Sequence, residues 1–211
     1  MAEQQYGSFS SLRGLIRQPR ARERCDLCGV GLLSEHEHLI DPKTHKVVCA
    51  CTACGLLFPS TGQTKYKRVP RRIRYLKSFR ITDGQWDGLL VPIGVAYFLK
   101  SSVEARVVSF YPSPAGPTES MLSLDVWEDI VQENPSLAEM ESDTEALLVN
   151  RLEHIRHGSE YYLVPIDKCY ELVGLIRSRW RGLSGGTEVW EEIRRFFKEL
   201  KERATPERVH A

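Results

Sequence analysis

Two Cys-x-x-Cys-Gly turns constrain this chain more than any other feature of its sequence. Cys25 and Cys28 form the first turn, and Cys51 and Cys54 form the second. This spacing is typical of two metal-binding knuckles that face each other across a folded loop. The sequence therefore predicts a four-cysteine metal site in a zinc-ribbon or rubredoxin-like module.

The residues between the two turns predict a hairpin that brings the knuckles together. Residues 37–41 and 45–49 have the composition of short strands, and the Asp-Pro-Lys-Thr segment between them has turn chemistry. We expect Gly29 and Gly55 to adopt a left-handed backbone conformation, because each follows a cysteine pair where the chain folds back. A module with so little core would depend on its metal for its fold.

A fifth cysteine, Cys49, leaves one position of the ligand set open. The symmetric set has Cys51 as its third ligand and Cys49 as a neighbouring thiol. The alternatives are a set with Cys49 in place of Cys51, or a cluster that uses all five cysteines. We expect zinc, with iron as the alternative, because an all-sulfur tetrahedral site suits both metals. Four thiolates saturate such a site, so we expect the nearby histidines to be structural or solvent-facing: His36, His38 and His45.

The composition is that of an average soluble globular protein. The chain has 211 residues, 42% of them hydrophobic, and its 29 basic and 28 acidic residues give a net charge of +1. No global electric field therefore recruits nucleic acid or membrane. The N-terminus lacks the basic start and apolar run of a secretory signal, and no segment approaches the roughly 20 apolar residues of a membrane span. We expect a cytoplasmic protein without membrane insertion, whose clustered cysteines bind metal rather than form disulfides.

We divide the chain into a flexible or docked tail over residues 1–20, the metal module over residues 21–60, and an α+β domain over residues 61–211. The fold class is α+β, a small four-cysteine module followed by a mixed domain with C-terminal helices. Alternating and continuous apolar patterns predict the strands of the domain, and 3.6-residue periodicity predicts its helices. Thr82 or Asp83 is expected to cap a short helix, and Asp167 is expected to cap the first C-terminal helix.

Two loops rich in glycine or proline are candidate partner-binding surfaces. Three prolines between Tyr111 and Pro117 predict an irregular, rigid segment. The segment from Trp180 to Gly186 opens onto a helix N-terminus, where an anion or a partner could bind. The plain interpretations are a connection stiffened by proline and an ordinary turn between helices. The candidate partner contacts are Tyr111, Pro112, Pro114, Trp180, Arg181, Gly185 and Gly186.

The segment from Lys65 to Tyr75 holds six basic residues in eleven, interleaved with aromatic residues. It is the one place where a nucleic-acid-binding patch could lie. The favoured interpretation is an edge strand whose charges face solvent and oppose aggregation. With a net charge near zero, nucleic acid is not an expected partner.

The sequence carries no recognised catalytic motif. It lacks a nucleophile elbow, a His-Glu-x-x-His helix and a phosphate-binding loop, and its cysteines have no dedicated general base. A zinc ion held by four thiolates is closed to substrate and therefore structural. We expect a non-enzymatic protein.

Several motifs resemble one bacterial family of unknown function. They include Cys-Asp-Leu-Cys-Gly, Val-Cys-Ala-Cys-Thr-Ala-Cys, Phe-Tyr-Pro-Ser-Pro-Ala-Gly, Val-Pro-Ile-Asp-Lys-Cys-Tyr and Trp-Arg-Gly-Leu-Ser-Gly-Gly. The resemblance extends from about Cys25 to Phe197. It implies a frequent location of the gene beside uptake [NiFe]-hydrogenase genes, and it brings no established activity.

The leading hypothesis is therefore a metal-binding accessory protein that binds a hydrogenase subunit or maturation factor during assembly. The first alternative is a rubredoxin-like iron protein that carries electrons for the hydrogenase. The second alternative is a zinc-dependent nucleic-acid-binding protein that uses the basic segment.

Overall fold

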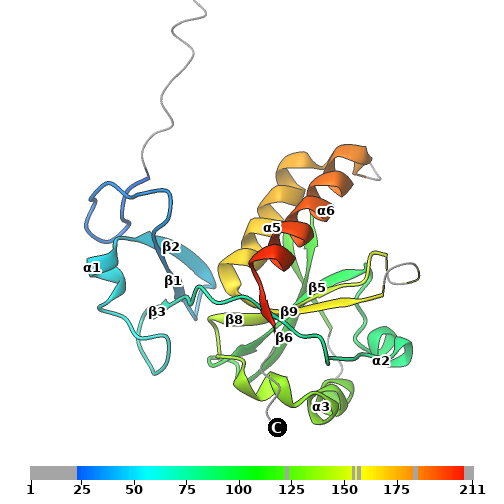
Figure 1. Cartoon of the computed structure of the whole chain (residues 1–211). Coiled ribbons are helices and arrows are strands. Elements are labelled where there is room, and N and C mark those ends of the chain that lie inside the picture. The colour runs from blue at the N-terminus through cyan, green and yellow to red at the C-terminus, as the bar shows by residue number, and fades with distance from the viewer. Residues whose placement is uncertain (1–22, 122–123, 154, 156–157, 183–184, 207–211) are drawn as a thin grey trace, which may run out of the picture.

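The computed structural model shows a small sheet beside a larger sheet that carries helices on both faces (Figure 1). This arrangement confirms the predicted α+β class. None of the described helices combines the length and apolar character that crossing a bilayer requires. The predicted tail, residues 1–20, lies outside the described residues. The structure describes residues 23–121, 124–153, 155, 158–182 and 185–206.

The small sheet has three antiparallel strands in the order β2-β1-β3. β1 (Glu37–Asp41) and β2 (Lys46–Ala50) form the predicted hairpin, which is therefore confirmed. β3 (Lys67–Arg68) pairs with the other edge of β1. A short helix, α1 (Thr52–Gly55), follows β2 and carries the second cysteine pair.

The two faces of the hairpin pack against different things, because successive side chains of a strand point to opposite faces. Leu39 and Val48 lie on one face and form a small core with Cys25 and Ala50. Ile40, the next residue of β1, lies in the core of the large domain. The hairpin therefore joins the metal module to the rest of the molecule through its second face.

The large sheet has seven strands in the order β10-β4-β9-β8-β5-β6-β7, antiparallel except for the β10–β4 pair. Its central strands are buried almost throughout, so apolar residues follow one another without alternation. The strands are β4 (Arg74–Tyr75), β5 (Val95–Ser101), β6 (Arg106–Ser113), β7 (Gly116–Ser120), β8 (Glu145–Asn150), β9 (Glu160–Pro165) and β10 (Thr205–Pro206).

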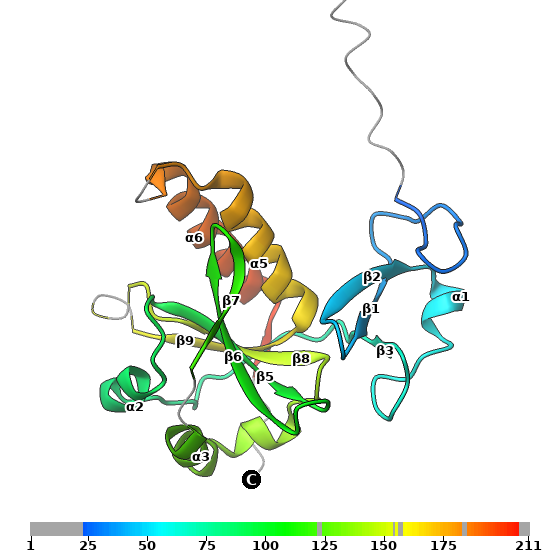
Figure 2. The same ribbon diagram turned by 180° about the vertical axis from the view of Figure 1, so that it is seen from behind.

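Helices cover both faces of this sheet (Figure 2). Along β5, Tyr97 and Leu99 enter a core shared with the C-terminal helices, whereas Ala96 and Phe98 enter a core shared with the helix that contains Trp127. The first core lies under α5 (Ile166–Arg179) and α6 (Gly186–Arg203). The second involves α2 (Asp83–Gly88), α3 (Leu124–Glu133) and the 3-10 helix η2 (Pro135–Glu139).

The predicted N-cap is correct for α2 and wrong for α5. Thr82 is the N-cap of α2 and forms a capping box with Gln85. It is one of the two residues that the sequence offered as the cap of this helix. Asp167 is not the cap of α5. Pro165 occupies that position and Asp167 lies in the first turn, where its carboxylate contacts His38. The expected cap was wrong because the helix begins at Ile166, one residue before Asp167, which places Asp167 inside the first turn.

The prediction of an irregular loop from Tyr111 to Pro117 was also wrong, since β6 and β7 continue through this segment as a hairpin. Pro112 and Pro117 lie opposite each other, so their missing N–H groups fall at one position of the ladder. Pro117 lies on the edge strand β7, and Pro112 lies beyond Phe110, where the pairing of β6 with β5 ends, so proline is tolerated at both positions. The Ser113 hydroxyl stabilises the turn by donating to the Gly116 carbonyl at 2.9 Å and accepting from the Ala115 N–H at 3.1 Å.

Candidate metal centre

The first knuckle is a tight turn that returns the chain after Cys25. The Gly29 N–H donates to the Cys25 carbonyl at 2.8 Å, and the Cys25 N–H donates to the Val30 carbonyl at 2.8 Å. Gly29 has a φ of 77°, so the left-handed conformation predicted for it is confirmed. The turn thus presents the thiols of Cys25 and Cys28 toward the second knuckle.

The second knuckle uses a helix start instead of a mirror image of the first. Cys51 is the N-cap of α1, and its Sγ accepts the N–H of Cys54 at 3.5 Å. The left-handed conformation predicted for Gly55 was wrong, because Gly55 is the last residue of this helix. A Cβ there would lie 2.8 Å from Cγ of Glu37, so glycine is needed for close packing against β1.

The two knuckles bring four thiols together. Sγ atoms of Cys25, Cys28, Cys51 and Cys54 all lie within 4.8 Å of one another, and those of Cys28 and Cys51 are 3.8 Å apart. Sulfurs bound tetrahedrally at ~2.3 Å from one ion lie about 3.8 Å apart, whereas a disulfide needs ~2.05 Å. The cluster can therefore hold a metal ion, and all its cysteines are free thiols.

The thiols of the cluster perturb one another's protonation. Burial raises the pKa of Cys25, but hydrogen bonds from backbone groups, first of Cys51 and then of Cys28, outweigh it and lower that pKa to about 6. Hydrogen bonds with the thiols of Cys51 and Cys28 raise the pKa of Cys54 to about 12. Four neighbouring thiolates therefore need a cation to coexist, which is the chemistry of a tetrahedral thiolate site.

Cys49 lies outside this cluster, on the hairpin face that is directed toward the large domain. One ligand atom of Cys49 lies within 4.8 Å of one from each of two histidines, His36 and His38. Burial, and then the negative charges of Asp26 and Glu23, raise the pKa of the Cys49 thiol. The structure thus groups Cys51, and not Cys49, with the other three knuckle cysteines.

A comparison with known protein families identifies one family to which the chain is similar. Residues 24–204 match DUF5947, a family of unknown function. The chain belongs to DUF5947. No curated protein and no solved structure matches it significantly. The resemblance to an uncharacterised family is confirmed, and its association with hydrogenase genes stays a prediction.

The predicted proline-rich surface of this DUF5947 protein is only partly exposed. Tyr111 is half-buried, Pro112 is buried and Pro114 is exposed at the turn of the β6–β7 hairpin. A Cβ at Gly116 would lie 4.0 Å from Cδ of Arg177, so the turn lies beside the C-terminal part of α5. Figure 2 shows the hairpin leaning along that helix.

The Trp180–Gly186 segment connects α5 to α6, and residues 183 and 184 lie outside the described part of the chain. Its ends pair as an isolated bridge between Arg181 and Gly185, and the Trp180 indole donates to the Gly182 carbonyl at 2.9 Å. Gly185 and Gly186 have φ values of 86° and 75°. A Cβ at Gly185 would lie 3.1 Å from the Trp180 ring, so the glycine makes room for the indole.

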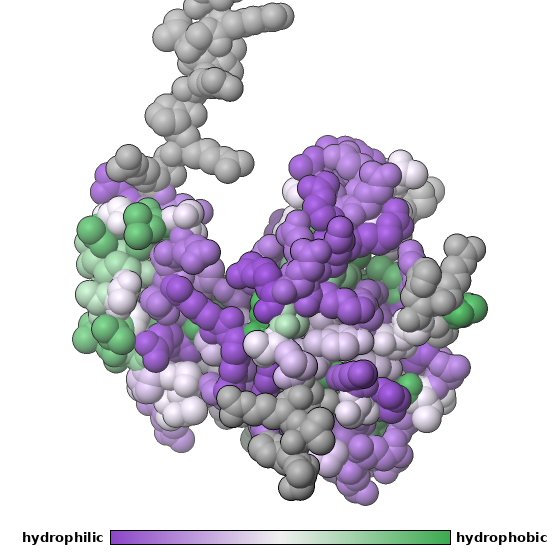
Figure 3. All heavy atoms as spheres, viewed as in Figure 1, coloured by the Kyte–Doolittle hydropathy of each residue, from purple (hydrophilic) through white to green (hydrophobic). Residues whose placement is uncertain are grey.

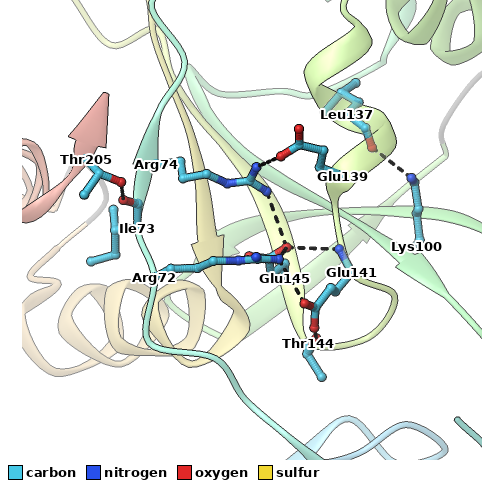
Figure 4. A network of polar contacts seen from close by, with 10 residues as sticks. All are labelled: Arg72, Ile73, Arg74, Lys100, Leu137, Glu139, Glu141, Thr144, Glu145 and Thr205. Carbon is cyan, nitrogen blue, oxygen red and sulfur yellow. Dashed lines mark hydrogen bonds and ion pairs between the residues drawn. The ribbon is translucent and has the colours of Figure 1, made fainter. Parts of the chain in front are cut away.

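Basic residues of the segment from Lys65 to Tyr75 form ion pairs with carboxylates of the large domain. The ammonium of Lys67 is buried and lies 2.5 Å from the Asp143 carboxylate. Arg72 contacts Glu145 at 2.7 Å and Glu141 at 2.9 Å, and Arg74 pairs with Glu139 (Figure 4). These cations already face carboxylates of the same chain, which weakens the hypothesis that they bind nucleic acid.

Sequence patterns did not predict that His36 and His38 lie beside Cys49, or that Asp167 contacts His38. The His38 and Asp167 side chains are 2.6 Å apart across 129 positions of the chain. The His38–Cys49 pairing follows from the hairpin register, and the histidine spacing is that of one strand face. The contact with Asp167 could not be predicted from a local pattern, because Asp167 lies on α5, far from His38 in the sequence.

Proposed function

We propose that this protein is a metal-binding accessory factor whose two knuckles, held together by a zinc ion, present an apolar surface to a partner protein. The partner would be a subunit or maturation factor of a [NiFe]-hydrogenase during assembly. The proposal rests on the apolar rim of the metal centre, and the choice of partner rests on the family resemblance.

The apolar rim is a set of exposed aliphatic side chains that flank the cysteines. Leu33 and Leu57 are 80% and 73% exposed. Figure 3 shows the green, apolar area concentrated on the metal module, whereas most of the rest of that face is hydrophilic. A contiguous exposed apolar patch marks an interaction site more often than it marks chance. The rim consists of Leu27, Val30, Leu33, Leu56 and Leu57.

The position of the rim links partner binding to metal binding. Leu27 lies between the cysteines of the first knuckle, and Leu56 and Leu57 directly follow the second. The cysteines hold both segments in place when they share one ion. A closed four-thiolate zinc would therefore act by organising a surface, which is the usual role of such a site.

The metal is tested first. Anaerobically purified protein should contain at least one zinc per chain and have no visible absorption. One iron per chain with thiolate-to-iron absorption would replace this proposal by the rubredoxin-like alternative.

Partner binding is tested by affinity capture from the native host under conditions of hydrogenase assembly. We expect the tagged chain to recover an identified hydrogenase subunit or maturation protein, and expect the Leu33→Glu and Leu57→Glu variants to lose it. Met121→Glu is the matched control, because Met121 is 86% exposed and belongs to the large domain. Recovery of no hydrogenase-related protein, or self-association of the chain through the rim, would overturn the proposed function.

A further inference from the structure

We propose that His36, His38 and Cys49 form a second metal site, open at one coordination position and distinct from the four-cysteine centre. One ligand atom of each lies within 4.8 Å of those of the other two. The site would take a late first-row divalent cation such as Co²⁺, Ni²⁺ or Zn²⁺, which prefers imidazole and thiolate ligands.

The hairpin register creates the site. His38 and Cys49 are direct cross-strand partners, so their side chains emerge side by side on one face of the hairpin. His36 precedes β1 by one residue, and its ring meets that of His38 edge-on with centroids 4.8 Å apart. The opposite face of the same hairpin belongs to the small core that contains Cys25.

Both imidazoles are oriented by their other nitrogen. His38 Nδ1 lies 2.6 Å from the Asp167 carboxylate, and His36 Nδ1 lies 2.9 Å from the Leu33 carbonyl. Neither a carboxylate nor a carbonyl can donate, so both Nδ1 atoms carry the proton. With Nδ1 as the donor, Nε2 is the nitrogen of each ring that can bind a metal ion. This is the arrangement by which metal-binding histidines are held in proteins.

His36 supplies the observation that points to a missing ligand. Its side chain is only 7% exposed, and its Nε2 is buried without a hydrogen-bond partner among the described residues. A buried acceptor without a partner is costly, since it loses its hydrogen bonds to water. A cation shared with Cys49 and His38 would satisfy it.

Carboxylates around the cluster favour a cation there. Asp26 Oδ2 accepts the Cys49 N–H at 2.7 Å, and Glu23 Oε2 lies 3.8 Å from His36 Nδ1. Asp167 adds a third carboxylate from α5. With three protein ligands, one position of a tetrahedral ion stays available to solvent or to an external ligand, unlike the closed four-thiolate centre.

The test titrates Co²⁺ into the full-length chain that already holds one zinc. We expect a second metal equivalent to bind with thiolate-to-cobalt absorption in the near ultraviolet, while zinc content stays at one per chain. Mg²⁺ should not compete, because it prefers oxygen ligands. A chain that takes up only one metal in total would overturn the proposal.

Variants assign the ligands. Cys49→Ser should remove the charge-transfer absorption, and His38→Gln should weaken the second equivalent while the first is retained. Asp167→Asn, which changes a positioning residue, should weaken it by roughly 10–100-fold. His45→Asn is the matched control and should change nothing, since His45 has a φ of 55° that asparagine tolerates.

The two variants at ligand positions keep the result decisive. If Cys49→Ser also loses the first zinc, His38→Gln alone decides. Cobalt binding that is unchanged in His38→Gln would contradict the site, whereas selective loss would support it. Neither result depends on hydrogenase binding, so this proposal and the accessory function can fail separately.

Discussion

The metal module and the α+β domain are stabilised by different means. The module has four buried apolar residues in its own core: Cys25, Leu39, Val48 and Ala50. The domain has two much larger cores, one on each face of its seven-stranded sheet. Apolar burial can account for the domain, whereas a core of four residues is too small to hold two knuckles and a hairpin. A metal ion held by the four clustered cysteines would therefore stabilise the module and not the domain.

Metal removal should produce the largest difference in stability between the module and the domain. Structural zinc contributes roughly 10–16 kcal/mol of apparent binding free energy in small zinc modules. Chelation, or Cys28→Ser, should therefore expose the backbone of the knuckles and weaken protection of β1 and β2. Hydrogen exchange followed by mass spectrometry measures this, with β8 and β9 as the internal control. A module that stays protected without metal would show that the comparison is wrong.

The buried Lys67–Asp143 pair joins the two regions, because β3 belongs to the small sheet and Asp143 precedes β8. Asp143→Asn should lower the free energy of unfolding by about 3–5 kcal/mol, since it leaves a buried ammonium without its counter-charge. Asparagine tolerates the φ of 68° at this position. Urea denaturation of the zinc-loaded protein gives the value.

The exposed Arg195–Glu192 pair provides the control for that measurement, because both residues lie on α6. Arg195→Ala should cost less than about 1 kcal/mol, as surface ion pairs do. Equal losses for Asp143→Asn and Arg195→Ala would mean that the joint between the regions adds little to stability.

The smallest effect is expected for the cap of α2, which belongs to the domain alone. Thr82→Ala removes the hydroxyl that accepts the Gln85 N–H at 3.2 Å and should cost about 1 kcal/mol. Thr82→Ser keeps the hydroxyl and should be close to wild type. Thermal denaturation reports the difference. Zinc affinity should be the same in both variants, and a change in it would reveal coupling that the comparison does not include.

Local patterns predicted those parts of the fold that neighbouring residues decide. The hairpin between the knuckles, an N-cap at Thr82 and an amphipathic C-terminal helix follow from turn chemistry, capping and periodicity. The same patterns failed for Tyr111 to Pro117, because proline is tolerated on the edge strand β7 and at the end of β6, where the pairing with β5 has already stopped at Phe110. Edge or centre is a property of the whole sheet.

The candidate sites divide in the same way. The sequence by itself determined that two cysteine knuckles face each other, because the cysteines of each pair are three residues apart and one turn presents both, but it left the choice between Cys49 and Cys51 open. Only the tertiary structure decided that Cys49 faces His36 and His38 and that Asp167 orients His38 across 129 positions. Packing α5 against the hairpin creates that contact, and such long-range packing depends on the complete core rather than on any local pattern.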